Sequence, residues 1–246
     1  MKILADLHVH TLASGHAYST IEETAKAAAA KGLEMIAITD HGPAMPGGPH
    51  QYYFGNLRVL PPEIHGVEIL RGAEVNILDE QGSLDLQEYY LKRLDIVLAG
   101  LHNVCMEPLC QKKNTKALVN ALQNPYVDII VHPGNPDFPI DMEKVVQTAK
   151  QQNKALEINN SSFLVRKGSR KPCREIARLA REYGILVSIS SDSHFSGNVG
   201  ELDLAVEVAL DAGIPAENIL NINGDRVRRF LARRGKRRFV SQSDGK

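Results

Sequence analysis

The sequence predicts a single-domain α/β barrel built from seven strands, each followed by a helical stretch. Three observations lead to this prediction. Short apolar runs alternate with longer helical patterns along the 246 residues, no long linker or shift in composition divides them, and residues that bind metals follow the apolar runs. Continuous apolar runs are typical of parallel strands buried on both faces. Seven such units favour one closed barrel over two smaller domains.

The predicted strands occupy residues 3–9, 35–39, 69–75, 96–101, 129–132, 156–159 and 186–190. The predicted helices between them occupy residues 20–31, 84–93, 115–123, 141–152, 172–183 and 199–212. The first helix has start signals, because Ser19 or Thr20 precedes two acidic residues, and Gly32, Gly184 and Gly213 follow three of the helical patterns. These residue types mark helix ends.

Two segments do not fit a regular strand–helix unit. Residues 50–66 contain two consecutive prolines, and we expect a loop with a short helix there. Residues 219–222 form an apolar run too short for a confident eighth strand, and we expect them to lead into a terminal helix over 225–234.

Composition restricts the possible partners and the compartment. The net charge of zero gives no overall electrostatic case for binding nucleic acid or an acidic membrane surface. Basic residues gather from Arg226 to Arg238, which we interpret as a solvated helix face leading into a basic tail from about residue 235, with a docking patch as the alternative. Three cysteines without zinc-ribbon spacing fit a reducing compartment. Because no apolar run reaches the length of a membrane span, we expect a cytoplasmic protein without a membrane partner.

Metal-binding residue types cluster where the predicted strands end. Seven of the nine histidines and two carboxylates lie at these ends or in the first loop: His8, His10, His16, His41, Glu74, His102, His132, Asp192 and His194. In a β/α barrel the carboxyl ends of the strands converge on one mouth. Nine ligand residues are too many for one tetrahedral metal, so the sequence predicts a metal cluster.

Three other polar features are expected near the same mouth. The sixth strand ends in a polar run, residues 159–162, which is suited to orienting a substrate or a water molecule. Asp40 precedes His41 and is expected to orient a ligating histidine, with a general acid as the alternative role. Arg166 follows in a loop above the mouth and is a candidate phosphate clamp, with a solvated surface arginine as the alternative.

The motifs together resemble those of the PHP (polymerase and histidinol phosphatase) superfamily, and most closely its stand-alone, YcdX-type phosphatase branch. The resembling segments are residues 6–10 with His16, then 38–42, 72–74, His102, 132–133 and 191–194. The resemblance extends over nearly the whole chain, from Ile3 to about Arg234. It implies a distorted, TIM-like barrel of seven strands and a metal-dependent phosphatase with a site for three divalent ions.

The resemblance also implies how the ligands divide among the ions. His8, His10, Glu74 and Asp192 would surround the first ion. His16, His41 and His194 would hold the second, and Glu74, His102 and His132 the third. Glu74 would therefore bridge two ions, which a carboxylate with two oxygens can do. The nitrogen-rich set favours zinc, and manganese or iron are the alternatives because carboxylates are mixed in.

The predicted activity is hydrolysis of phosphate monoesters on a small phosphorylated substrate, with a metal-bound hydroxide as the nucleophile. Alternatives are a PHP phosphodiesterase or exonuclease, an amidohydrolase-like metal hydrolase, and a non-enzymatic metal-binding or storage protein. Nine ligand positions exceed the usual one or two metals of amidohydrolases, and no basic stripe surrounds the motifs as an exonuclease would need. The sequence leaves the natural substrate and the oligomeric state open, a trimer included.

Overall fold

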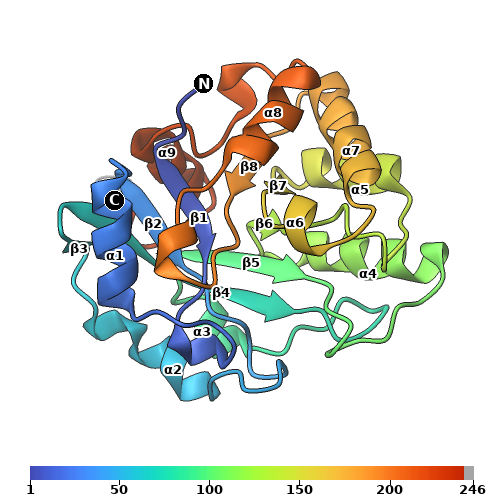
Figure 1. Ribbon diagram of the computed structural model, residues 1–246. Coiled ribbons are helices and arrows are strands. Elements are labelled where there is room, and N and C mark those ends of the chain that lie inside the picture. The colour runs from blue at the N-terminus through green and yellow to red at the C-terminus, as the bar shows by residue number, and fades with distance from the viewer. Residues whose placement is uncertain (241–246) are drawn as a thin grey trace, which may run out of the picture.

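Seven parallel strands form the wall of a nearly closed barrel, and helices pack around its outside (Figure 1). The computed structural model describes residues 1–240, so the last residues of the predicted basic tail, 241–246, lie outside the described part. The predicted fold class is confirmed. The strands run in the order β1, β2, β4, β5, β6, β7 and β8 around the barrel.

Each predicted strand is present with small shifts in its bounds. The barrel strands are β1 (Ala5–Val9), β2 (Met35–Ile38), β4 (Val67–Asn76), β5 (Ile96–Gly100), β6 (Ile129–Ile130), β7 (Ala155–Asn159) and β8 (Val187–Ser190). Their burial is nearly complete on both faces, as the continuous apolar runs predicted. A short strand that was not predicted, β3 (Glu63–Ile64), pairs antiparallel with the start of β4.

The barrel closes between β8 and β1 through two kinds of contact. At the carboxyl end, Val9 bridges directly to Ser193. At the amino end, residues 219–222 lie between the two strands: Leu220 donates its N–H to the carbonyl of Val187, and Ala5 donates its N–H to the carbonyl of Asn221. The short apolar run thus takes the place of an eighth strand, and it then leads into the terminal helix as expected.

The predicted helices also appear, several with changed bounds. They are α1 (Ile21–Ala30), α3 (Glu88–Leu91), α4 (Gln111–Gln123), α5 (Met142–Gln151), α7 (Arg170–Tyr183), α8 (Asp203–Asp211) and α9 (Gly224–Arg233). The loop-rich segment 50–66 contains α2 (Gln51–Asn56), and the mouth loop contains the short α6 (Ser162–Val165). Helix α1 begins with a capping box, in which Thr20 and Glu23 exchange hydrogen bonds.

Two helices begin several residues later than the sequence predicted. The predicted helix 84–93 begins only at Glu88, because Leu84 pairs with Ile77 and the Asp85 carboxylate accepts the backbone N–H of Asn76. The predicted helix 199–212 begins only at Asp203, since Gly200 adopts a left-handed φ of 72°.

Clusters of buried apolar side chains pack on both faces of the barrel wall. One lies inside the barrel and includes Leu7, Leu70 and Leu98. A second lies between the strands and helices such as α4, α5, α7 and α8, which cover one side of the barrel (Figure 1), and a third packs α1 against β1, β2 and β4. No helix among residues 1–240 combines the length and apolar composition that a membrane span requires.

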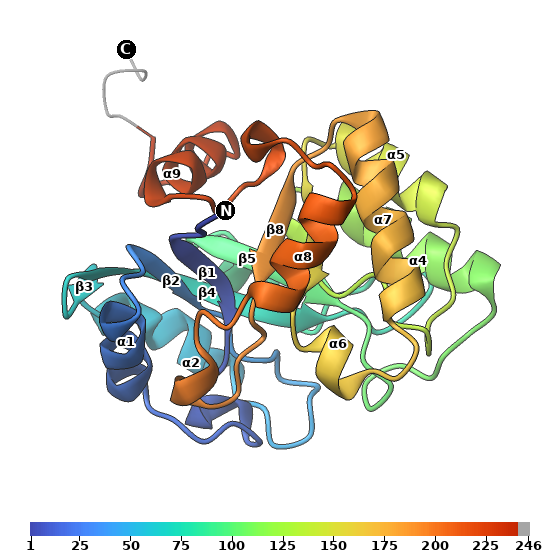
Figure 2. The same cartoon turned by 45° about the horizontal axis from the view of Figure 1, so that its top comes forward.

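Much of the basic segment 226–238 is bound to the barrel rather than solvated. Helix α9 lies beside the amino terminus (Figure 2). After it, Arg234 and Lys236 pair with the buried carboxylate of Asp128, and Arg238 pairs with Asp95. The interpretation as a solvated face is therefore wrong for these residues, although Arg229, Arg233 and Arg237 are exposed.

Candidate metal centre

A single buried carboxylate, Glu74 at the carboxyl end of β4, lies at the centre of the predicted ligands. Its Oε2 atom is 3.3 Å from His8 Nε2, 3.4 Å from His10 Nε2 and 2.8 Å from His41 Nδ1. Its Oε1 atom is 3.0 Å from His102 Nε2 and 2.9 Å from His132 Nε2. Five imidazoles delivered by the ends of four other strands thus face the two oxygens of one side chain.

Asp192 is a second carboxylate at the same centre. Its Oδ1 atom is 3.6 Å from His8 Nε2 and 3.3 Å from His10 Nε2. His8 lies in β1 and His10 directly follows its last residue, so the two side chains, two residues apart in extended backbone, point to the same side, as the sequence predicted.

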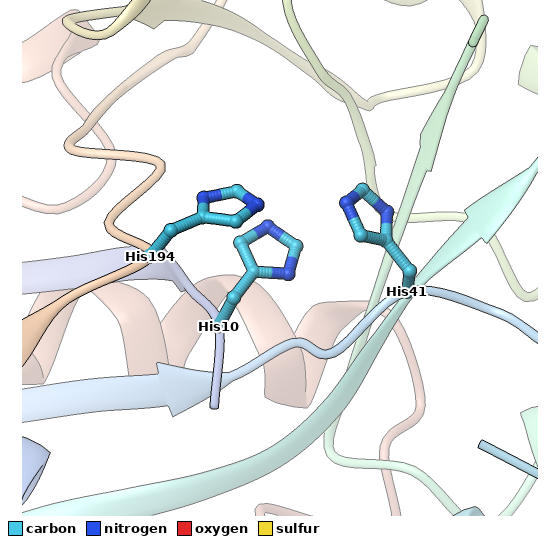
Figure 3. Close-up of side chains that lie close together, drawn as sticks. All are labelled: His10, His41 and His194. Atoms are coloured by element: carbon cyan, nitrogen blue, oxygen red, sulfur yellow. The ribbon is translucent and has the colours of Figure 1, made fainter. Parts of the chain in front are cut away.

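Three imidazoles approach each other on the outer side of the centre. His10, His41 and His194 place ring nitrogens within 4.8 Å of one another, with His41 facing the other two rings (Figure 3). His16 is more exposed, and its ring centroid is 5.0 Å from that of His41 and 4.9 Å from that of His194. All nine predicted ligands therefore belong to one contiguous cluster. Within this cluster, the group of three residues close enough to hold one ion combines His41 and His194 with His10, whereas the resemblance had implied His16 as their partner.

The backbone at the centre is unusual in two places. Among residues 1–240, four non-glycine residues have positive φ, and two of them are the candidate ligands His132 (34°) and Asp192 (55°). Such conformations persist where the surroundings enforce them, and they cluster at functional sites. Gly100, at the end of β5, leaves the space in which Glu74 and His132 meet: a Cβ there would lie 2.8 Å from His132 Cε1 and 3.1 Å from Glu74 Oε1.

Two groups of polar residues orient the imidazoles from behind. The buried Glu157 in β7 accepts a hydrogen bond from His8 Nδ1 at 2.8 Å and another from the His132 backbone N–H at 2.8 Å. His10 Nδ1 lies 3.1 Å from Ser14 Oγ, and the Ser14 hydroxyl donates to Asp40 at 2.7 Å. With Nδ1 occupied in this way, the Nε2 lone pairs of His8 and His10 are directed at the centre.

Asp40 is therefore close to the candidate ligands without touching their rings. Its carboxylate accepts the hydroxyl protons of Ser14, Thr11 and Tyr53, the last at 2.6 Å. The Ser14 hydroxyl links the buried Asp40 carboxylate to His10 Nδ1, so Asp40 is placed where it could orient this histidine, and that role stays a prediction.

Arg166 lies at the mouth, where α6 ends. Its guanidinium donates to Asp192 Oδ2 at 3.3 Å, to Ser162 Oγ at 3.1 Å and to Asn159 Oδ1 at 3.3 Å. Asp192 thus turns one oxygen toward the histidines and the other toward Arg166. The polar run 159–162, which we expected to orient a substrate or a water molecule, thus also binds Arg166.

Burial and charge set the protonation of the centre. Burial alone would raise the pKa of Glu74, but His41, His102 and His8 hold it well below its ordinary value. Burial, reinforced by the charge of Arg166, lowers the pKa of His132 to about 4. Burial and the neighbouring histidines His41 and His194 likewise lower the pKa of His10 well below its ordinary value. Glu74 is therefore a carboxylate at neutral pH, and His10 and His132 are neutral imidazoles, which are the forms that bind metals.

His8 differs from the other histidines. Burial opposes its charged form, but the carboxylates of Glu157, Asp192 and Glu74 raise its pKa well above the ordinary value. A cation entering the centre would therefore compete with a proton on His8.

A cavity of about 630 Å³ opens above the centre. Its polar lining includes His16, His41, His102, Asp192, His194 and Arg166, and its apolar lining includes Met45, Pro46, Val104 and Val165. The volume falls in the range of small-molecule sites.

Sequence reasoning missed two contributors to the centre. Glu157 lies inside the mostly apolar strand β7, two residues before Asn159, so both side chains point to the same face of the strand. A charged residue at this position was the signal that could have identified it. Tyr53 lies in the segment 50–66, and nothing local indicated that its hydroxyl reaches Asp40. The two histidines outside the predicted ligand set are also outside the centre: His50 caps α2, and His65 pairs with Glu22 at the surface.

Sequence comparison finds relatives along most of the chain. Residues 6–161 match the family model of the PHP domain. A probable phosphatase of Caldanaerobacter subterraneus is 54% identical over 239 residues, which are 96% of this chain and 94% of the relative. A probable phosphatase of Shewanella piezotolerans is 50% identical over 236 residues, 96% of each chain.

Comparison with solved structures finds the same architecture at low sequence identity. A histidinol phosphate phosphatase from Lactococcus lactis, solved with zinc, L-histidinol and phosphate, has a TM-score of 0.61 at 14% identity. The match covers 87% of this chain and 95% of that one. A dihydroorotase has a TM-score of 0.51 at 14% identity, covering 97% of this chain and 71% of that chain. At these identities the likeness concerns the fold.

Proposed function

Because the chain belongs to the PHP domain family, we propose that it is a phosphatase that hydrolyses phosphate monoesters at a site of three divalent ions, with zinc as the metal. The broader class, a metal-dependent hydrolase of phosphoric esters, was predicted from the sequence and is supported by the family and by relatives named as probable phosphatases. The number and kind of ions, the monoester preference and the residue roles are the proposal.

One observation carries the proposal. Among the described residues, His8 Nε2, His10 Nε2, His41 Nδ1 and Glu74 Oε2 are buried atoms without a hydrogen-bond partner, and they face one another. Buried polar atoms without partners are costly, and lone pairs that converge in this way fit cations. The nitrogen-rich donor set favours zinc over magnesium or calcium, and the solved histidinol phosphate phosphatase of the same fold contains zinc.

The chain's own residues would divide the work at the site. Glu74 would hold two ions through its two oxygens, because each oxygen faces its own set of imidazoles. Asp192 would hold an ion beside His8 and His10 and keep Arg166 over the mouth. The planar guanidinium can then bind two oxygens of the phosphate group. When bound, the ions would supply an activated water and neutralise charge on the phosphate.

The size and lining of the cavity support a small phosphate monoester as the proposed substrate. The cavity encloses a volume suited to a small molecule, and its polar residues lie next to the imidazoles. The apolar residues Val104 and Val165 would contact the organic part of the substrate. We therefore expect a small phosphorylated metabolite rather than a polymer.

Two measurements test the proposal. Protein purified without chelators should contain about three equivalents of zinc by elemental analysis and should hydrolyse para-nitrophenyl phosphate faster than its bis ester. Glu74→Gln should lose more than one equivalent and the activity, whereas Glu207→Gln, an exposed glutamate, should change neither. Turnover of the diester alone, or full metal content in Glu74→Gln, would contradict the proposal.

A further inference from the structure

A second cavity, of about 590 Å³, lies outside the barrel and carries a concentration of positive charge. We call it the basic pocket. Helices α2 and α3, the middle of β4 and the end of the basic segment form its walls. Its charged lining consists of six cations and one carboxylate: Arg58, Arg71, Lys92, Arg93, Arg237 and Arg238, with Asp95.

The basic pocket is separate from the metal centre. Arg71 and Glu74 are three residues apart on β4, so their side chains leave opposite faces of the strand. Glu74 points into the barrel, and Arg71 points outward to Asp95. The basic pocket and the cavity above the metal centre have no lining residue in common.

The described residues balance only part of the charge of the basic pocket. Its lining contains six cations and one carboxylate, in a chain whose net charge is zero. Asp95 already pairs with Arg71 at 3.0 Å and with Arg238 at 2.9 Å, and Arg238 also pairs with Glu68 at 2.9 Å. Within residues 1–240, no carboxylate lies within 4 Å of Arg58, Lys92, Arg93 or Arg237. An anion is the complement that this group of cations lacks.

The basic pocket is also lined by aromatic rings. Tyr52, Tyr89 and Tyr90 line the basic pocket, and Tyr52 and Tyr89 are 67% and 54% exposed. The guanidinium of Arg93 lies 3.6 Å from the centroid of the Tyr89 ring, so that arginine is held in place before a ligand arrives. Exposed tyrosine faces stack on nucleobases, and arginine forks bind phosphate oxygens.

We propose that the basic pocket binds a mononucleotide with several phosphate groups, such as a nucleoside triphosphate, at a site distinct from the metal centre. The phosphates would lie among Arg58, Lys92 and Arg237, and the base would stack on a tyrosine. A cavity of this volume suits one nucleotide, whereas RNA is bound along extended grooves that follow its backbone.

The test is calorimetric titration of the full-length protein with the β,γ-methylene analogue of ATP. Adenosine, inorganic triphosphate and a single-stranded RNA oligonucleotide serve as separate probes. The double variant Arg58→Ala, Arg237→Ala removes two exposed cations of the basic pocket. The double variant Arg229→Ala, Arg233→Ala removes two exposed arginines of α9 that do not line it.

We expect the analogue to bind the wild type and the control variant alike, and to bind the pocket variant at least about tenfold more weakly, since each lost charge-assisted bond costs affinity. Hydrolysis of para-nitrophenyl phosphate by the pocket variant should be unchanged. Adenosine alone should not bind measurably, and triphosphate should bind more weakly than the analogue.

Three results would overturn the proposal. No binding at millimolar analogue, or equal binding by the pocket variant, would remove the basic pocket as the site. Triphosphate binding as tightly as the analogue would remove the nucleoside from the ligand. Tighter binding of the RNA, lost in the pocket variant, would assign the surface to RNA instead. The proposed phosphatase activity is tested separately, by the metal content and by the hydrolysis of para-nitrophenyl phosphate.

Discussion

Glu157 orients two candidate ligands with one buried carboxylate. One oxygen accepts the Nδ1 proton of His8, and the other accepts the backbone N–H of His132, a residue with a positive φ. A hydrogen-bonded carboxylate behind an imidazole fixes its tautomer and makes the other nitrogen a better ligand. The role of Glu157 is therefore one of positioning.

Substitution of Glu157 by glutamine should weaken metal binding while the fold is kept. Glutamine preserves the shape, but it removes the negative charge that faces His8. We expect metal affinity to fall by about 10- to 100-fold, measured by competition with a chromophoric chelator. Glu217→Gln, on the exposed surface, is the matched control. Unchanged affinity in Glu157→Gln would show that the carboxylate does not support the ligands.

Lys154 should make the stability of the protein depend on alkaline pH. Burial, together with the charge of Arg234, lowers its pKa to about 7, against about 10.4 for an unfolded lysine. Between these values the unfolded chain binds more protons, so this residue's destabilising effect decreases as pH rises. The free energy of unfolding of the wild type, relative to Lys154→Met, should therefore increase from pH 7 to about pH 10. Denaturant titrations of both proteins would check this, and a constant or falling difference would contradict it.

The candidate ligands were easier to predict than the residues behind them. Ligands such as His102 and His132 stand directly after apolar runs, and strand ends meet at one mouth in this fold. Glu157 and Tyr53 act through contacts across the barrel, which depend on the packing of distant segments. Local sequence patterns carry no signal for such contacts.

At the scale of elements, one carboxylate attaches the end of the chain to the barrel. Asp128 precedes β6 and is fully buried, and it pairs with Arg234 and Lys236, which follow α9. It also accepts the backbone N–H of Val97 in β5. The sequence predicted helix α9 itself, but a run of basic residues does not reveal a buried acidic partner far away in the chain.

Asp128→Asn should therefore destabilise the protein strongly. Asparagine keeps the shape and can still accept a hydrogen bond, but it leaves the buried Lys236 and the partly buried Arg234 without this counter-charge. Removing one partner of a buried ion pair lowers the free energy of unfolding by about 3–5 kcal/mol. Denaturant titration would measure this loss. Asp211→Asn breaks only the exposed pair with Arg174 and should cost less than about 1 kcal/mol. Equal effects of the two changes would mean that Asp128 does not hold α9.

Element bounds depended on contacts that the sequence pattern does not contain. The helical pattern over 84–93 is interrupted because the Asp85 carboxylate binds the backbone N–H groups of Ala44 and Asn76. Helix α4 instead begins at Gln111, earlier than predicted. The type of nearly every element followed from periodicity, whereas its ends followed from tertiary hydrogen bonds.

For the molecule as a whole, function depends on how the barrel is closed. Strands β1 and β8 deliver four of the candidate ligands, His8, His10, Asp192 and His194, from the two sides of the closure. Below them the strands are joined through residues 219–222. The side chain of Asn221 is fully buried there: it accepts the N–H of Ile189 in β8 and donates to the carbonyls of Ala5 in β1 and of Ile189.

Asn221→Leu should couple a loss of stability to a loss of metal binding. Leucine has a similar size but leaves one N–H and two carbonyls without their partner, and each unsatisfied buried group costs about 1–3 kcal/mol. We expect unfolding free energy to fall by about 3 kcal/mol. Because the join between β1 and β8 is loosened, metal affinity should also fall, although Asn221 touches no candidate ligand. Asn218→Leu, three residues earlier and without a side-chain hydrogen bond in the described structure, should leave both quantities nearly unchanged. If Asn221→Leu lost stability but kept its metal affinity in conditions where it is fully folded, the closure would support the fold alone, and the ligands would be held by their own strands.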